Sequence, residues 1–156
     1  MILVSACLMG KKCRYDGNDN LIFEVVENVD HAILCCPEVL GGLPTPRVPA
    51  EITNGTAEDV IDGNAQVITK EGIDVTAEFL AGAYHSLELA KENKVSIAIL
   101  KERSPSCGSC FVYDGTFTGK KIPGAGITTA LLRRHGIRVY SEENFNEVVN
   151  HGMRSK

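Results

Sequence analysis

Three of the six cysteines stand where short apolar segments end, and these positions carry the most chemical information in the chain. They are Cys7, Cys36 and Cys107. Short apolar runs predict buried strands, and right-handed crossovers bring the carboxyl ends of parallel strands to one edge of a sheet. Open α/β sheets bind ligands in the crevice at that edge. Because thiolates are soft ligands, three converging cysteines indicate a metal or an iron–sulfur cluster with one coordination position left open.

The other three cysteines allow different interpretations. Cys13 lies in the loop after the first apolar segment and is a candidate for a further ligand. Cys35 precedes Cys36 on the same predicted strand, so we expect it to point to the opposite face and to pack there. Cys107 and Cys110 form a C-x-x-C pair, which is also typical of thiol–disulfide redox sites. That alternative leaves the two earlier strand-end cysteines without a role.

Four polar residues close to these cysteines could act on a bound ligand. Glu38 follows Cys36 by two positions in a loop of prolines and glycines, where a carboxylate suits general acid–base work. Ser104 and Ser106 stand just before the third strand-end cysteine, where a hydroxyl can relay a proton or hydrogen-bond a substrate. Arg47 follows the two glycines and three prolines of the same loop, and its guanidinium suits a carboxylate, a phosphate or a pyrimidine carbonyl.

Alternating strands and helices must position these residues. Apolar runs predict strands over 1–6, 32–36, 96–100 and 137–140. Helical spacing and capping residues predict helices over 20–29, 74–93 and 126–135 and a last helix from 141. Residues 37–50 predict a functional loop, 51–73 a hairpin with its tip at 62–64, and 111–119 a turn-rich excursion. The order predicts an α/β fold, a doubly wound, mostly parallel sheet of about four core strands with a small β-hairpin appendage.

Composition limits the functional classes. A length of 156 residues predicts one domain over 1–156, and the formal net charge of −4 argues against a nucleic-acid coat. No apolar run approaches the roughly 20 residues of a membrane span, and the basic residues follow the first apolar run, which is the wrong order for a signal peptide. We therefore expect a cytoplasmic protein, in which cysteines serve metal or redox chemistry. The glycines at 124–126 follow no strand in the dinucleotide pattern, so close helix packing is their expected use.

Five motifs together resemble the DUF523 family over nearly the whole chain. They are Val4-Ser5-Ala6-Cys7-Leu8-x-Gly10, Arg14-Tyr15-Asp16-Gly17, Cys36-Pro37-Glu38 with Gly41-Gly42-Leu43-Pro44-x-Pro46-Arg47, Ser104-Pro105-Ser106-Cys107-Gly108, and Tyr113-Asp114-Gly115-Thr116-Phe117. The length is similar to that of the short single-domain form of the family.

The resemblance implies a specific chemistry. The family includes bacterial thiouracil desulfidases, which bind a [4Fe–4S] cluster through three cysteines and leave the fourth iron free for a thiocarbonyl sulfur. Carried over to this sequence, the cluster ligands are Cys7, Cys36 and Cys107, and the acid–base candidates are Glu38 and Ser104. The implied substrate is a small thiolated pyrimidine or related thioamide. The alternatives are a non-catalytic metal or cluster carrier with four cysteine ligands, and a thiol–disulfide oxidoreductase acting through the C-x-x-C pair.

Overall fold

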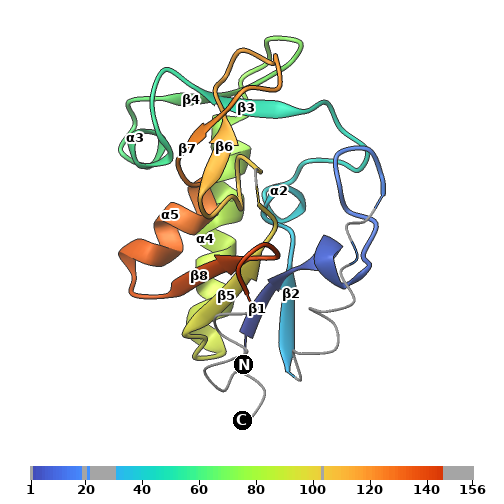
Figure 1. The fold of residues 1–156 in the computed structure, drawn as a ribbon, viewed down its shortest axis with the longest axis vertical. Helices are drawn as coiled ribbons and strands as arrows, with labels where there is room; N and C mark the ends of the chain where they lie inside the picture. Colours follow the sequence, from blue (N-terminus) through green and yellow to red (C-terminus); the bar gives the residue numbers. More distant parts are fainter. Residues whose placement is uncertain (1, 19–20, 22–30, 103, 146–156) are drawn as a thin grey trace.

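A four-stranded parallel sheet forms the centre of the protein (Figure 1). The computed structural model describes residues 2–18, 21, 31–102 and 104–145. The strands are β1 (Ile2–Ser5), β2 (Ala32–Cys35), β5 (Ile97–Leu100) and β8 (Arg138–Ser141), and their order across the sheet is β2-β1-β5-β8. The chain passes outward from β1 to β2 and then crosses back to β5 on the other side of β1. This reversal creates a crevice at the carboxyl ends of β1 and β5.

The two central strands are buried on both faces. Leu3 and Ala98 belong to one apolar cluster and Val4 and Ile99 to a second one, and all four are fully buried. Successive side chains of a strand point to opposite faces, so each strand supplies both clusters. This explains why the strands are continuous apolar runs rather than alternating ones.

Two helices pack against the face of the sheet that carries Leu3 and Ala98. They are α4 (Thr76–Glu92) and α5 (Ile127–Arg134), and their buried residues share a cluster with those of β1, β5 and β8. The apolar positions Phe79, Ala83, Leu87 and Ala90 recur at helical spacing and are buried. The N-cap is Val75, which offers no side-chain cap, although the Asp74 carboxylate before it accepts the Thr76 amide over 2.8 Å. None of the described helices is long and apolar enough to cross a membrane.

The predicted helix over 20–29, apart from Leu21, and all of the last predicted helix beyond residue 145 lie outside the described residues. In the described start of that last segment, Ser141 is the last residue of β8, and 142–145 form turns. Its serine cap is nevertheless in use, because the Glu143 amide donates to the Ser141 hydroxyl over 3.0 Å.

The segment after β2 contains a short helix that the sequence did not predict. α2 (Pro37–Leu40) is a single turn that Cys36 precedes, and the Leu40 amide donates to the Cys36 carbonyl over 2.9 Å. The interpretation of 37–50 as wholly irregular was therefore wrong at its beginning. A proline at the first helical position lacks only an N–H that would have no partner there. From Gly41 to Pro49 the chain has no helix or strand.

α2 and α4 meet backbone to backbone. A Cβ at Gly41 would overlap the Glu78 carbonyl, and a Cβ at Gly82 would overlap the Pro37 carbonyl. The two glycines therefore permit an approach that no side chain allows. This contact sets the position of Pro37 and of its two neighbours in sequence, Cys36 and Glu38.

Two antiparallel hairpins stand above the carboxyl edge of the sheet (Figure 1). One pairs β3 (Ala50–Thr53) with β4 (Gln66–Thr69), and the other pairs β6 (Phe111–Tyr113) with β7 (Lys121–Pro123). The predicted hairpin tip at 62–64 was wrong, because α3 (Ala57–Ile61) intervenes between β3 and β4. A capping box between Thr56 and Asp59 starts this helix and outweighs the β-branched residues Val60 and Ile61. The second hairpin replaces the predicted turn-rich excursion.

The substitution Gly82→Ala tests the contact between α2 and α4. Alanine normally stabilises a helix interior by about 0.5–1 kcal/mol relative to glycine. Here we expect the free energy of unfolding to fall by about 1–3 kcal/mol, because the added methyl group overpacks the contact. Urea unfolding measures the change, and Ala81→Ser on the exposed face of α4 is the control, with an expected effect within about 0.5 kcal/mol. A more stable Gly82→Ala variant would contradict the contact.

Candidate functional site

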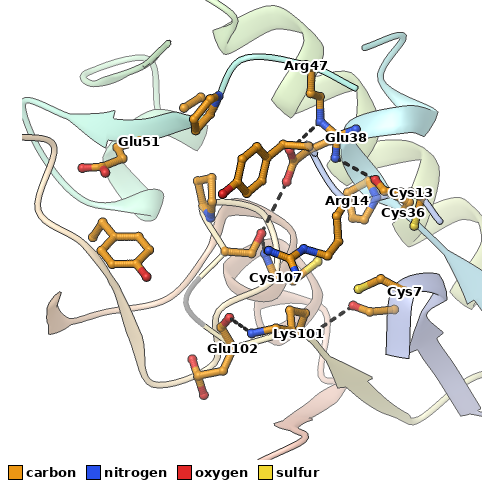
Figure 2. A pocket seen from close by; sticks show the side chains of 18 of the residues that line it. Cys7, Cys13, Arg14, Cys36, Glu38, Arg47, Glu51, Lys101, Glu102 and Cys107 are labelled. Atoms are coloured by element: carbon orange, nitrogen blue, oxygen red, sulfur yellow. Dashed lines mark hydrogen bonds and ion pairs between the residues drawn. The ribbon is translucent and has the colours of Figure 1, made fainter. Parts of the chain in front are cut away.

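A cavity of about 420 Å³ opens at the carboxyl edge of the sheet and extends beneath the two hairpins (Figure 2). Its volume is in the range of small-molecule sites. Five of the six cysteines line it: Cys7, Cys13, Cys35, Cys36 and Cys107. Every cysteine is a free thiol. The structure thus brings the three predicted ligands to one cavity, at the point where the strand order reverses.

Cys7, Cys13 and Cys36 lie together on one side of the cavity (Figure 2). Cys7 belongs to the 3-10 helix η1 (Ala6–Met9), which follows β1 directly. Gly10 ends this turn with a φ of 95°, and the Lys11 amide then donates to the Ala6 carbonyl over 3.1 Å. The chain is folded back on itself, so that Cys13 lies beside Cys36 and Cys7, and Cys36 Sγ is 3.8 Å from the Cys13 carbonyl oxygen.

These contacts set different proton affinities for the clustered thiols. The hydrogen bond from Cys13 lowers the pKa of Cys36 to about 7. The same bond, with the bond to Cys7, raises the pKa of Cys13 above its ordinary value. Burial raises the pKa of Cys107 well above its ordinary value and that of Cys35 to about 12. Of these thiols, Cys36 is therefore the one that loses its proton most readily.

The loop that carries Cys107 is held by a buried carboxylate. Glu102 is 2% exposed, and its Oε1 accepts backbone N–H groups from Ser109 at 2.7 Å, Cys110 at 3.0 Å and Phe111 at 3.1 Å. Its Oε2 accepts the Ser109 hydroxyl at 2.7 Å. Hydrogen bonds to an ionised acceptor are about twice as strong as neutral ones. Glu102 therefore fixes the chain on the far side of the third predicted ligand.

The start of α5 supports the same loop from below. The amides of Ile127 and Thr128 donate to the carbonyls of Pro105 and Ser106, both over 2.8 Å, and the Thr129 hydroxyl donates to the Cys107 carbonyl over 2.8 Å. A Cβ at Gly126 would overlap the Ser106 backbone. Close packing is thus the use of this glycine, as the sequence predicted.

Glu38 faces the Ser104–Cys107 loop across the cavity. Its Oε1 accepts Arg47 Nε at 3.0 Å, and its Oε2 accepts the Ser106 hydroxyl at 3.1 Å and the Ser104 hydroxyl at 3.4 Å. The ion pair is shielded from water, since the side chain of Arg47 is 7% exposed and that of Glu38 is 17% exposed. Both hydroxyls donate to the same carboxylate oxygen, so each is placed to exchange a proton with Glu38.

Arg47 and Ser106, the two predicted substrate-binding residues, form hydrogen bonds within the protein. Arg47 donates to the Pro44 carbonyl at 3.2 Å, the Thr45 hydroxyl at 3.1 Å and the Cys13 carbonyl at 3.0 Å, in addition to Glu38. Four of its five N–H groups thus have acceptors among the described residues, and one remains for a ligand. Ser106 is 1% exposed and lies behind the lining residue Ser104, so its hydroxyl reaches Glu38 rather than the cavity. Their substrate-binding roles stay predictions.

The outer wall of the cavity comes from the hairpins and was not predicted. Tyr113 and Phe117 line it beside Glu51 of β3. The Glu51 carboxylate accepts the amides of Gly115 at 2.9 Å and Phe117 at 3.2 Å, which ties the second hairpin to the first. The backbone of Gly115 has a φ of 92°, which the glycine allows without strain. The Tyr113–Phe117 motif was the available sequence signal, and flat aromatic side chains suit a flat ring as ligand.

The donor set fits an iron–sulfur cluster. Five cysteines line one largely apolar cavity, among them Cys7, Cys36 and Cys107, and thiolates are the ligands that such clusters require. Within the part of the chain that the structure describes, no three Cys, His, Asp or Glu side chains converge on a single point as ligands of one metal ion do.

The C-x-x-C pair is divided between two environments. Cys107 is buried and faces the cavity, whereas Cys110 is exposed and lies outside it. Cys110 leads into β6 rather than into a helix. Reactive redox cysteines have lowered pKa values, and the burial of Cys107 raises its pKa instead.

Fold and site together define an α/β enzyme scaffold with a thiol-lined cavity, and the sequence matches the family described as 2-thiouracil desulfurase over residues 2–144. The chain belongs to this family, which confirms the resemblance to DUF523. It is 52% identical over 151 residues to a Bacillus subtilis (strain 168) protein described as uncharacterized protein YbbK, covering 96% of this chain and 100% of that one. It is also similar to the structure of TudS, a [4Fe–4S]-dependent thiouracil desulfidase, with a TM-score of 0.84, 46% identity, and coverage of 96% and 95% of the two chains.

The substitution Glu102→Gln tests how the Cys107 loop is held. The amide keeps the shape of the side chain but removes the charge that four donors share. We expect the free energy of unfolding to fall by about 2–3 kcal/mol, because charge-assisted bonds are lost in a buried place. Urea unfolding measures the loss, and Glu71→Gln at an exposed turn is the matched control. Equal stabilities of the two variants would show that Glu102 has no such role.

Proposed function

We propose that this protein is a desulfidase that removes sulfur from a thiocarbonyl compound such as a thiolated uracil, using a [4Fe–4S] cluster. The observation that carries the proposal is the meeting of Cys7, Cys36 and Cys107 with Glu38 and Ser104 in the lining of one cavity. Family membership and the likeness to TudS support it. We also propose that residues 1–156 act as one domain.

Cys7, Cys36 and Cys107 are the proposed cluster ligands. Each belongs to or adjoins an anchored element: η1 after β1, the start of α2, and the loop held by Glu102 and α5. When bound, the cluster supplies an iron that accepts the soft sulfur of the substrate and assists its departure as sulfide. The chain's own residues supply the fixed ligand positions, a largely apolar cavity and the proton path.

Glu38 and Ser104 are the proposed acid–base pair. Replacing sulfur by oxygen forms a C–O bond with water and breaks the C–S bond, so one water and one thiocarbonyl give one carbonyl and hydrogen sulfide, with no net electron transfer. Glu38 takes a proton from the attacking water or delivers one to the ring nitrogen. Arg47 holds the carboxylate, and the Ser104 hydroxyl passes the proton along the cavity.

The hairpin wall is the proposed binding surface for the ring. Tyr113 and Phe117 offer flat aromatic faces, and the remaining N–H of Arg47 is a donor for a pyrimidine carbonyl. The partner is thus a small thiolated pyrimidine or related thioamide.

A cluster carrier is the second candidate function. The contact of Cys13 with Cys7 and Cys36 favours it, because a fourth permanent thiol ligand would close the site to substrates.

Metal analysis and turnover test the proposal together. Protein purified and reconstituted without oxygen should hold about four iron and four sulfide per chain and should release sulfide from 2-thiouracil. The Cys107→Ser variant should lose the cluster, whereas Cys110→Ser, at an exposed position outside the cavity, should retain it. Zinc or no metal after reconstitution would refute the desulfidase. A full cluster without turnover of any thiolated pyrimidine would favour the carrier.

The substitution Glu38→Gln separates catalysis from cluster binding. We expect the variant to keep its iron and sulfide and to lose about 10²–10⁴-fold in kcat, the usual contribution of a general acid–base group. Stopped assays of sulfide release and iron analysis measure the two effects, with Glu71→Gln as the control carboxylate. Unchanged kcat would exclude Glu38 as the acid–base group.

A further inference from the structure

We propose that Ser5 is a positioning residue of the cluster site: its hydroxyl donates a hydrogen bond to the sulfur that Cys107 contributes to the cluster. This inference rests on the proposed function. It assigns a role to a residue of the first sequence motif, 4–10, that neither the proposed ligands nor the acid–base pair account for. Hydrogen bonds to ligand sulfurs tune the electronic properties of an iron–sulfur cluster, so such a donor acts on the chemistry without touching the substrate.

Ser5 lies at the carboxyl end of β1, and its side chain is 3% exposed and lines the cavity. Successive side chains of a strand alternate between the two faces, so Ser5 shares a face of the sheet with Leu3. Cys107 packs with Leu3 in the apolar cluster on that same face, and it also lines the cavity. The Ser5 hydroxyl and the Cys107 thiol therefore reach the cavity from the same side of the sheet.

One hydrogen bond fixes the Ser5 oxygen and leaves its hydrogen for another acceptor. The amide of Lys101, the residue directly after β5, donates to Ser5 Oγ over 2.9 Å. A hydroxyl that accepts one hydrogen bond can still donate its own hydrogen. No oxygen or nitrogen atom of the described residues accepts that hydrogen. Because a buried donor without an acceptor is costly, sulfur atoms on this face are the acceptors that remain.

Two cysteines on this face could accept the hydrogen of Ser5. Cys35 is the residue paired with Ser5 on β2, and Cys107 lies in the loop after β5. Cys35 is not a proposed ligand, and the sulfur of a thiol is a weak acceptor. A thiolate bound to iron carries negative charge, and hydrogen bonds to charged acceptors are about twice as strong as those between neutral groups. The Cys107 sulfur is therefore the preferred acceptor when the cluster is bound.

The hydrogen bond predicts two effects on the loaded protein. One-electron reduction adds negative charge to the cluster and its ligands, so a donor at a ligand sulfur stabilises the reduced state more than the oxidised one. Its loss therefore lowers the reduction potential. Withdrawal of charge from the sulfur also makes the irons better acceptors for the substrate sulfur. Groups that hydrogen-bond to metal ligands typically contribute about 10–100-fold to metal affinity or activity.

Anaerobic comparison of Ser5→Ala and Ser5→Thr with wild type tests the inference, and Ser96→Ala at an exposed position before β5 is the control. A redox titration followed by electron paramagnetic resonance should give Ser5→Ala about tenfold less reduced cluster, relative to oxidised, at a given solution potential. Such a change corresponds to about 59 mV for one electron. Electron nuclear double resonance should show one exchangeable proton fewer near the cluster in Ser5→Ala. We also expect kcat/KM for 2-thiouracil to fall about tenfold in Ser5→Ala. Ser5→Thr keeps the hydroxyl and should resemble wild type in all three measurements.

Two results with the variants would overturn the inference. An unchanged potential and proton spectrum in Ser5→Ala, even with a lower melting temperature, would show that Ser5 only holds the Lys101 amide. Equal potentials of Ser5→Thr and Ser5→Ala, both below that of wild type, would exclude the hydroxyl as the cause. A crystal structure of the loaded wild type, grown without oxygen, decides the matter if Ser5→Ala does not load. It should place Ser5 Oγ within hydrogen-bonding distance of Cys107 Sγ, and a bond to Cys35 instead would refute the inference.

The failure of this inference and that of the proposed function can be told apart. Absence of a cluster from the wild type would remove both. A wild type that holds the cluster without turnover, while Ser5→Ala shows the lower potential, would refute the desulfidase and leave the hydrogen bond intact. Turnover by the wild type with no change of potential in Ser5→Ala would remove the hydrogen bond alone.

Discussion

The buried ion pair between Arg47 and Glu38 is the interaction on which the site depends. The guanidinium joins the Cys13 loop, which is distant in sequence, to the turn of α2 and to its own proline-rich loop. Removing one charge of a shielded ion pair costs more free energy than an exposed ion pair contributes, because the remaining charge is left without a partner. Through Arg47, the proline-rich segment therefore connects the Cys13 loop to the Glu38 carboxylate. Loss of Arg47 would affect both, even if the arginine never contacts a substrate.

The loop that carries Cys107 is held by a separate set of hydrogen bonds. Four donors converge on the Glu102 carboxylate, and the first residues of α5 bind the carbonyls on the other side of the loop. A loop at the edge of a sheet carries many backbone groups that need partners, and here a buried side chain and a helix end supply them. Cys107 thus has a fixed position without belonging to a helix or strand. A cluster bound between Cys107 and the other thiols would join two independently supported halves of the cavity.

The two faces of the sheet contribute differently to the cavity. Cys7 and Cys13 pack in the cluster on one face, with Cys36 against it, whereas Cys35 and Cys107 pack in the cluster on the other. They meet only at the carboxyl edge, which is where a ligand can contact both. The hairpins then enclose this edge, and the Glu51 contacts join one hairpin to the other. A chemistry that must bind a soft sulfur and exclude bulk water benefits from such an enclosed edge.

Much of the architecture follows from the sequence alone. Apolar runs too short for helices predicted the four parallel strands, because strands that are buried on both faces are apolar throughout. The 3.6-residue period of apolar residues predicted α4, because that helix buries one stripe of its surface. Cysteines and an acidic residue directly after these runs indicated the site, since strand ends meet at one edge. Tertiary structure decided the rest. α2 exists because Gly41 and Gly82 let two backbones touch. α3 is different, because the Thr56–Asp59 capping box that starts it is a local signal that the β-branched residues obscured. Three further features depend on distances between segments, which no local pattern encodes. They are the contact of Cys13 with Cys7 and Cys36, the internal acceptors of Arg47, and the burial of Ser106 behind Ser104.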